Sequence, residues 1–122
     1  MTAKKVLVVD DETFIVRMLV TSLSREGHLV FSAHDGQKGI EAARRERPDL
    51  IIMDWCMPRM DGIEATVQIR RDPDLAHIPI LMLTCKGQEM DEETALAAGA
   101  SRYVTKPFHI GRFGEIVNEL LR

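Results

Sequence analysis

The stretch Leu50-Ile51-Ile52-Met53-Asp54 decides the fold, because it places an acid directly after a continuous apolar run. Such a run is typical of a strand covered on both faces, as in a parallel sheet. Short apolar runs recur at Val6-Leu7-Val8-Val9, Leu29-Val30-Phe31, Ile80-Leu81-Met82-Leu83 and, more weakly, Tyr103-Val104-Thr105. The sequence therefore predicts a sheet built from these five segments.

Helical patterns fill the intervals between the runs, over residues 13–26, 37–46, 62–71, 89–98 and 110–121. In the first of these, helical spacing predicts a buried stripe made of Phe14, Ile15, Met18, Leu19 and Leu23. Residues that suit helix ends follow four of the segments, namely Gly27, Pro48, Pro73 and Gly99. Helices and strands are thus expected to alternate along the whole chain.

This alternation predicts an α/β fold, a three-layer flavodoxin-like (βα)5 sandwich with right-handed crossovers. The expected five-stranded parallel sheet has the strand order 2-1-3-4-5. The chain has 122 residues, which is the size of one ordinary domain. We therefore expect a single domain over residues 1–122.

Composition excludes several classes of function. Lys plus Arg is 16 and Asp plus Glu is 19, and this net charge of −3 disfavours general binding of nucleic acid or an anionic membrane. The one basic cluster, Arg44-Arg45-Glu46-Arg47, suits the solvated end of a helix better than a docking site. Two cysteines, Cys56 and Cys85, are too few for a disulfide framework or a four-ligand zinc site. The run Val6–Val9 is too short for a signal peptide, and no apolar stretch could span a bilayer, so we expect a cytoplasmic protein.

Polar residues stand at the carboxyl ends of the predicted strands. In open parallel sheets these ends share one edge, where ligands bind at the reversal of strand order. The first and third strands are expected to be neighbours, about 4.8 Å apart, so Asp10, Asp11 and Asp54 should lie close together. The polar residues at this edge are Asp10-Asp11-Glu12, Asp54, Thr84 and Lys106, with Pro107 next in the chain.

Clustered carboxylates raise one another's pKa, and a hard divalent cation relieves that repulsion. Mg²⁺ prefers oxygen ligands and commonly binds one or two carboxylates together with a phosphate. Lys106 would supply a compact positive charge for phosphate oxygens, and Thr84 a hydroxyl donor. Asp54 is then left as a nucleophile for phosphoryl transfer.

Each of these residues taken singly also has an ordinary structural explanation. The pair Asp10-Asp11 suits the start of a helix, and Asp54 suits a turn. Thr84 alone reads as a strand-end hydroxyl, and Lys106 as an exposed lysine before a turn. Their joint placement at the ends of four strands favours the functional interpretation.

The chain resembles the receiver domain of two-component response regulators from Lys5 to Leu121. The resemblance implies that Asp54 accepts a phosphoryl group from a histidine kinase or a histidine phosphotransfer protein. It is carried by Val6-Leu7-Val8-Val9-Asp10-Asp11-Glu12, by Asp54 followed by Met57-Pro58-Arg59-Met60-Asp61-Gly62, by Thr84, and by Lys106-Pro107-Phe108.

The same resemblance implies a cofactor and a role for each site residue. Mg²⁺ would be bound by Asp11, Asp54 and the backbone carbonyl of Cys56, with Asp10 assisting through water. Lys106 would hold the phosphoryl group. Self-phosphorylation and hydrolysis of the product would be the only reactions, so turnover of a separate substrate is not expected.

The resemblance further implies a cis peptide bond before Pro107 and a two-state switch. Thr84 would move toward the phosphoryl oxygens, and Tyr103 would turn inward, although an ordinary half-buried strand tyrosine fits Tyr103 as well. The fourth helix, fifth strand and fifth helix would then signal to a downstream protein or a covalently linked output domain. The kinase, the output partner and any phosphorylation-dependent dimer are not decided by the sequence.

Three competing functions fit the sequence less well. A haloacid dehalogenase-like phosphatase needs a second acid two residues after its nucleophile, where this chain has Cys56. A flavodoxin-like flavin binder needs a Ser/Thr/Gly-rich phosphate loop after the first strand, and Asp10-Asp11-Glu12 would repel a phosphate there. A pseudo-receiver would lack some of the acids or the lysine, and this chain retains all of them.

Cys85 departs from the family pattern, since the residue after Thr84 is usually very small. A larger side chain there should restrict access to the acyl phosphate. We therefore expect phosphotransfer or hydrolysis to be slower in the wild type than in Cys85→Ala, measured as phosphorylation and dephosphorylation rates. Equal rates in the two proteins would contradict this prediction.

Overall fold

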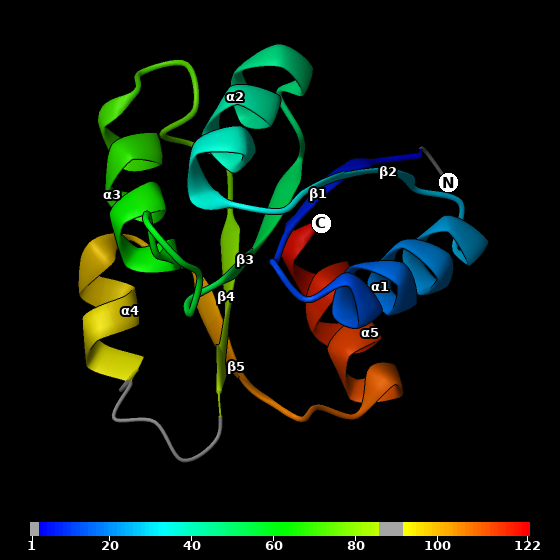
Figure 1. Cartoon of the computed structure of the whole chain (residues 1–122). Coiled ribbons are helices and arrows are strands. Elements are labelled where there is room, and N and C mark those ends of the chain that lie inside the picture. Colours follow the sequence, from blue (N-terminus) through cyan, green and yellow to red (C-terminus); the bar gives the residue numbers. More distant parts are fainter. Residues whose placement is uncertain (1–2, 86–91) are drawn as a thin grey trace.

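The computed structural model describes residues 3–85 and 92–122, and it has the predicted alternation of strands and helices (Figure 1). The strands are β1 (Lys5–Val9), β2 (Leu29–Ala33), β3 (Leu50–Asp54), β4 (Ile80–Cys85) and β5 (Arg102–Lys106). The helices are α1 (Thr13–Arg25), α2 (Gly36–Glu46), α3 (Gly62–Arg71), α4 (Glu92–Ala98) and α5 (Ile110–Leu120). All pairings are parallel, and the order β2-β1-β3-β4-β5 confirms the expected topology.

Two separate apolar cores lie on the two faces of this sheet. Helices α1 and α5 cover one face, and α2, α3 and α4 cover the other (Figure 1). Alternate residues of each central strand enter opposite cores, so that β3 sends Ile51 and Met53 to one and Leu50 and Ile52 to the other. This double burial explains why the central strands are apolar throughout rather than alternating.

Local sequence signals fix the helix ends. The side chains of Asp35 and Asp61 accept backbone hydrogen bonds at the starts of α2 and α3, from Lys38 N at 2.8 Å and Glu64 N at 2.9 Å. Gly27 and Gly99 follow α1 and α4 with φ of +91° and +117°, a backbone conformation that glycine adopts without strain.

Residues 89–91, expected to start the fourth helix, lie outside the described residues. No helix in the described part of the chain combines the length and the apolar character that a membrane span requires.

The predicted buried stripe of α1 is confirmed at Leu19 and Leu23, and Ile15 packs against the same core, but the prediction was wrong for Phe14. Phe14 is 75% exposed, and the buried residues are Val16, Leu19 and Leu23. Each helical residue turns the chain by about 100°, so Phe14 and Val16 lie on nearly opposite sides of the helix. The helix docks on the sheet through the smaller Val16 side, which leaves the aromatic ring facing outward.

Gly62 allows the start of α3 to approach the end of β3 closely. Its backbone N–H donates to the carbonyl oxygen of Trp55 at 2.8 Å. A Cβ at this position would collide with the carbonyl oxygen of Asp54 and would lie 2.8 Å from the Cα of Trp55. Space rather than backbone freedom therefore explains the glycine, and the contact fixes the chain next to Asp54.

We expect Gly62→Ala to lower the free energy of unfolding by about 1–3 kcal/mol, because the added methyl group must displace backbone atoms. The better helix propensity of alanine opposes this loss by up to about 1 kcal/mol. Urea unfolding is the measurement, and Glu64→Ala, at an exposed position on the same helix, is the control. A Gly62→Ala protein as stable as the control would show that no such displacement occurs.

Candidate functional site

Four polar side chains are buried at the carboxyl edge of the sheet. Asp10 follows β1. The other three lie at the carboxyl ends of their strands: Asp54 is the last residue of β3, Thr84 the last but one of β4, and Lys106 the last of β5. Asp10 is 0% exposed and Asp54 is 1% exposed, and Thr84 and Lys106 are buried as well. Asp54 is paired in register with Leu83, the residue before Thr84. The sequence placed these side chains after the strands, but the sheet ladder includes three of them and so holds their backbone in place.

The ammonium group of Lys106 holds this edge together. Its Nζ donates hydrogen bonds to Asp10 Oδ2 and Glu12 Oε1, both at 2.8 Å. The same nitrogen lies 3.3 Å from Asp54 Oδ1, which is an ion-pair distance. One cation therefore faces three carboxylates, and we call Asp10, Glu12, Asp54 and Lys106 the carboxyl-edge site.

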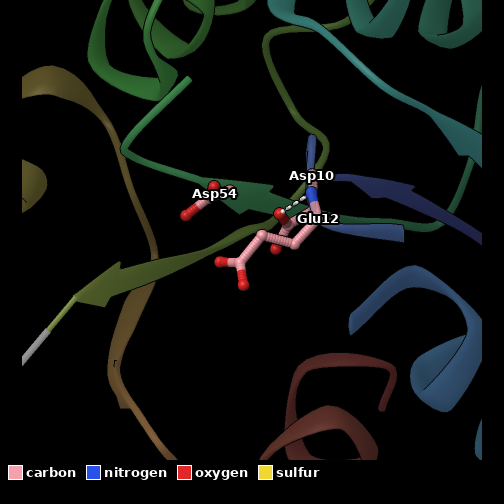
Figure 2. A group of neighbouring side chains, drawn as sticks. All are labelled: Asp10, Glu12 and Asp54. Carbon is pink, nitrogen blue, oxygen red and sulfur yellow. Dashed lines mark hydrogen bonds between the residues drawn. The ribbon is translucent and has the colours of Figure 1, made fainter. Parts of the chain in front are cut away.

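The two buried aspartates differ in their hydrogen bonding. Asp10 Oδ2 accepts from Lys106, and Asp10 Oδ1 accepts from the backbone N–H of Glu12 at 2.9 Å (Figure 2). Both carboxylate oxygens of Asp54 are buried without a well-directed hydrogen bond, and Lys106 Nζ lies 3.3 Å from Oδ1. Each oxygen of Asp10 thus accepts a hydrogen bond, whereas Asp54 keeps its lone pairs available for another group.

Burial and charge shift the pKa values of this site in a consistent way. Burial raises the pKa of Asp54, the negative charge of Asp10 raises it further, and Lys106 opposes both, with a result of about 7. Burial by itself lowers the pKa of Lys106, but the hydrogen bonds that Lys106 donates to Asp10 and Glu12 and the charges of Asp10 and Asp54 outweigh it, so that the pKa lies above its ordinary value. Lys106 is therefore cationic at neutral pH, while Asp54 is poised between its two protonation states.

The carboxylates form a donor set that can hold a metal ion. Figure 2 shows Asp10, Glu12 and Asp54 gathered at one place, and one oxygen from each lies within 4.8 Å of the other two. Such a set of acids with one ammonium keeps a net negative charge, and the two unpartnered oxygens of Asp54 are suited to a cation. All-oxygen ligands of this kind fit a hard divalent ion such as Mg²⁺.

Glu12 belongs to this group, and sequence reasoning had not assigned it a role there. Asp11, which it had assigned, is exposed and is not one of the three grouped acids. The chain bends at Asp11, and the backbone N–H of Glu12 donates to Asp10 Oδ1, while the side chains of Asp10 and Glu12 both reach Lys106. The run Asp10-Asp11-Glu12 marked this group of acids in the sequence, but it did not indicate which of them face the site.

The remaining predicted site residues have the following places. Cys56 is half-buried just beyond β3, and Tyr103 in β5 is half-buried against the core on the α2–α4 side of the sheet. The peptide bond between Lys106 and Pro107 is cis. The side chain of Cys85 lies outside the described residues, so the prediction made for it stays a prediction.

Known proteins match the chain over nearly its whole length. The family model described as the response regulator receiver domain matches residues 6–118. The alkaline phosphatase synthesis transcriptional regulatory protein PhoP of Bacillus subtilis is 44% identical over 119 residues, 98% of this chain and 49% of PhoP. The chain thus spans about half the length of this curated relative.

Solved structures agree with this similarity. The chemotaxis protein CheY4 of Vibrio cholerae superposes with a TM-score of 0.91 at 32% identity, over 98% of this chain and 100% of CheY4. A putative response regulator from Chloroflexus aurantiacus gives a TM-score of 0.92 at 30% identity, over 98% of each chain.

We expect Asp54→Asn to change how stability depends on pH when divalent ions are removed with a chelator. The pKa of Asp54 in the folded protein is about 7, above the value of about 4 in the unfolded chain. Its contribution to stability is therefore complete below about pH 4 and is lost as the pH rises through 7. Asparagine lacks this loss, so the variant should gain on the wild type by roughly 1 kcal/mol per pH unit over that window.

The measurement is urea unfolding of both proteins from pH 4 to pH 8. Asp11→Asn, which alters an exposed neighbouring carboxylate, is the control and should show a smaller gain. Curves for Asp54→Asn and wild type that run parallel across the window would show that Asp54 is not perturbed.

Proposed function

This chain belongs to the response regulator receiver family, and on that premise we propose that Asp54 accepts the phosphoryl group. The observation that carries the proposal is the contrast between the two buried aspartates. Asp54 has two oxygens without hydrogen bonds beside a permanent cation, whereas both oxygens of Asp10 are engaged. Of these two acids, Asp54 is the one whose carboxylate can turn toward an incoming group without giving up an existing hydrogen bond.

The donor in this proposal is a phosphohistidine on a histidine kinase or a histidine phosphotransfer protein. An oxygen of Asp54 forms a bond to phosphorus as the bond from phosphorus to the imidazole nitrogen breaks, and the imidazole keeps the electron pair and takes up a proton. Hydrolysis follows when a water oxygen attacks phosphorus and the bond to Asp54 breaks. That step restores the carboxylate and releases inorganic phosphate, so the cycle modifies only the chain itself.

Lys106 and Thr84 would complete the reacting centre. Nζ of Lys106 lies 3.3 Å from Asp54 Oδ1, and its charge opposes the negative charge that the phosphoryl group brings. Thr84 is buried on β4, the strand next to β3, where its hydroxyl would donate to a phosphoryl oxygen. Because Lys106 is fixed by Asp10, its charge needs little reorganisation when phosphorus arrives.

We propose that Mg²⁺ is the cofactor. Asp54 and the backbone carbonyl of Cys56 would bind it together with Asp11, and Asp10 would assist through water. The donor set described above supports Asp10 and Asp54, while Asp11 and Cys56 rest on the family resemblance. When bound, the ion supplies neutralisation of the negative charge on the phosphoryl oxygens.

The output would leave through the face formed by α4, β5 and α5. Thr84 would move toward the phosphoryl group and Tyr103, half-buried and paired in register with Met82, would turn inward. The recipient would be a downstream protein or a linked output domain, which agrees with the greater length of PhoP. The assignment of residues 1–122 to one receiver domain and the cytoplasmic location are part of the same proposal.

The test is treatment with a small phosphodonor in the presence of Mg²⁺, followed by intact mass measurement. We expect the wild type to gain one phosphoryl group and Asp54→Asn to gain none. Asp74→Asn, which alters an exposed aspartate, is the matched control and should behave as the wild type does. Phosphoryl uptake that survives in Asp54→Asn would place the acceptor elsewhere.

A further inference from the structure

The two carboxylates that hold Lys106 are not equally bound to the rest of the protein. Asp10 is 0% exposed, and its second oxygen is fixed by the backbone of Glu12. The side chain of Glu12 is 54% exposed. Water can therefore solvate the Glu12 carboxylate as soon as it leaves Lys106, whereas Asp10 has no such replacement.

Glu12 is also not needed to form the helix that follows it. It occupies the residue before α1, a position where a side chain commonly accepts a hydrogen bond from the first turn, but its carboxylate makes no such bond. The carboxylate instead lies 2.8 Å from Lys106 Nζ. Its placement is explained by the carboxyl-edge site and not by helix capping.

A phosphoryl group on Asp54 would compete for the same cation. It brings between one and two negative charges and three acceptor oxygens, and an ammonium has three N–H donors. Two of these donors are already used by Asp10 and Glu12. Since Asp54 Oδ1 is 3.3 Å from Lys106 Nζ, the added oxygens would enter the space that faces Glu12 and would be repelled by its charge.

We propose that Glu12 is a positioning residue that occupies Lys106 until Asp54 is phosphorylated, and so weakens the hold of the site on the phosphoryl group. This inference rests on the proposed function of Asp54. Glu12 is the partner that gives way because it is the one that water can reach. The strength of its competition sets how readily the site takes and keeps phosphorus.

The same residue has a second explanation with opposite consequences. Its oxygen lies within 4.8 Å of oxygens of Asp10 and Asp54, which is also the placement of a metal ligand. Loss of a metal ligand would weaken Mg²⁺ binding and, through it, the binding of a phosphoryl group. Loss of a competitor for Lys106 would strengthen the binding of a phosphoryl group once Mg²⁺ is saturating.

The experiment compares wild type with Glu12→Gln, using beryllofluoride as the probe of the phosphoryl position at saturating Mg²⁺. Trp55, the only tryptophan, follows Asp54 in the chain and its fluorescence reports binding. Mg²⁺ alone is titrated first in each protein. We expect Glu12→Gln to lower the dissociation constant of beryllofluoride by about 3- to 10-fold, the range for loss of a partly exposed charged hydrogen bond.

Two further variants separate contact from general charge. Glu12→Asp keeps the charge but shortens the side chain, so it should lose the contact with Lys106 and tighten beryllofluoride binding at least half as much on a logarithmic scale. Glu64→Gln removes the same charge from an exposed position on α3 and should leave the constant unchanged. Tightening of equal size in Glu64→Gln would overturn the proposal, because any carboxylate would then have the same effect.

Other outcomes also decide the matter. An unchanged or larger dissociation constant in Glu12→Gln would overturn the competition, and a larger one together with weaker Mg²⁺ binding would identify Glu12 as a metal ligand. Wild-type protein that shows no response to beryllofluoride, or a response that persists in Asp54→Asn, would instead refute the proposed function of Asp54. The two failures are therefore distinguishable.

Discussion

Burial of two aspartates beside one lysine is the constraint on which the rest of this structure depends. Asp10 and Asp54 lie at neighbouring strand ends and are almost completely removed from water. Among the residues that the structure describes, Lys106 is the cation that contacts both of them. Like charges in such a place are costly, and a single ammonium offsets only part of that cost. The unrelieved part appears as the raised pKa of Asp54. A site that is left partly uncompensated is ready to bind a cation and a reactive group.

The parallel sheet provides the rigidity that such a site needs. Asp54 and Lys106 are the last residues of their strands, so the backbone ladder and two apolar cores hold them in place. Beyond the strand ends, close backbone contacts continue this support. Trp55 donates to the carbonyl oxygen of Leu83 at 2.8 Å, and Gly62 packs directly on the chain at Asp54. Stability and function are thus coupled, because the elements that form the core also aim the acids.

The roles of the acids follow from their hydrogen bonds rather than from their residue type. Both oxygens of Asp10 accept hydrogen bonds, and Asp10 serves as an anchor for Lys106. Glu12 is bound to the same lysine but remains in contact with solvent, and Asp54 is buried with no hydrogen bond. The match to the receiver family over residues 6–118 identifies the type of domain, and this graded series of environments explains how neighbouring carboxylates can do different things within it.

The sequence by itself determined the order of elements, the parallel sheet and the edge where the polar residues meet, because doubly buried strands require continuous apolar runs and parallel strands share their ends. It identified Leu19 and Leu23 on the buried side of α1 but not Val16, and the exposed ring of Phe14 shows that docking on the sheet decided where the buried stripe ends. Nor did it distinguish Glu12 from Asp11, since the direction of a side chain past a strand end depends on backbone angles that neighbours impose. Only the tertiary structure showed that Lys106, far along the chain, is already held by Asp10 and Glu12. Whether two distant residues make contact depends on how the whole chain packs, and local patterns of residue type do not encode that packing.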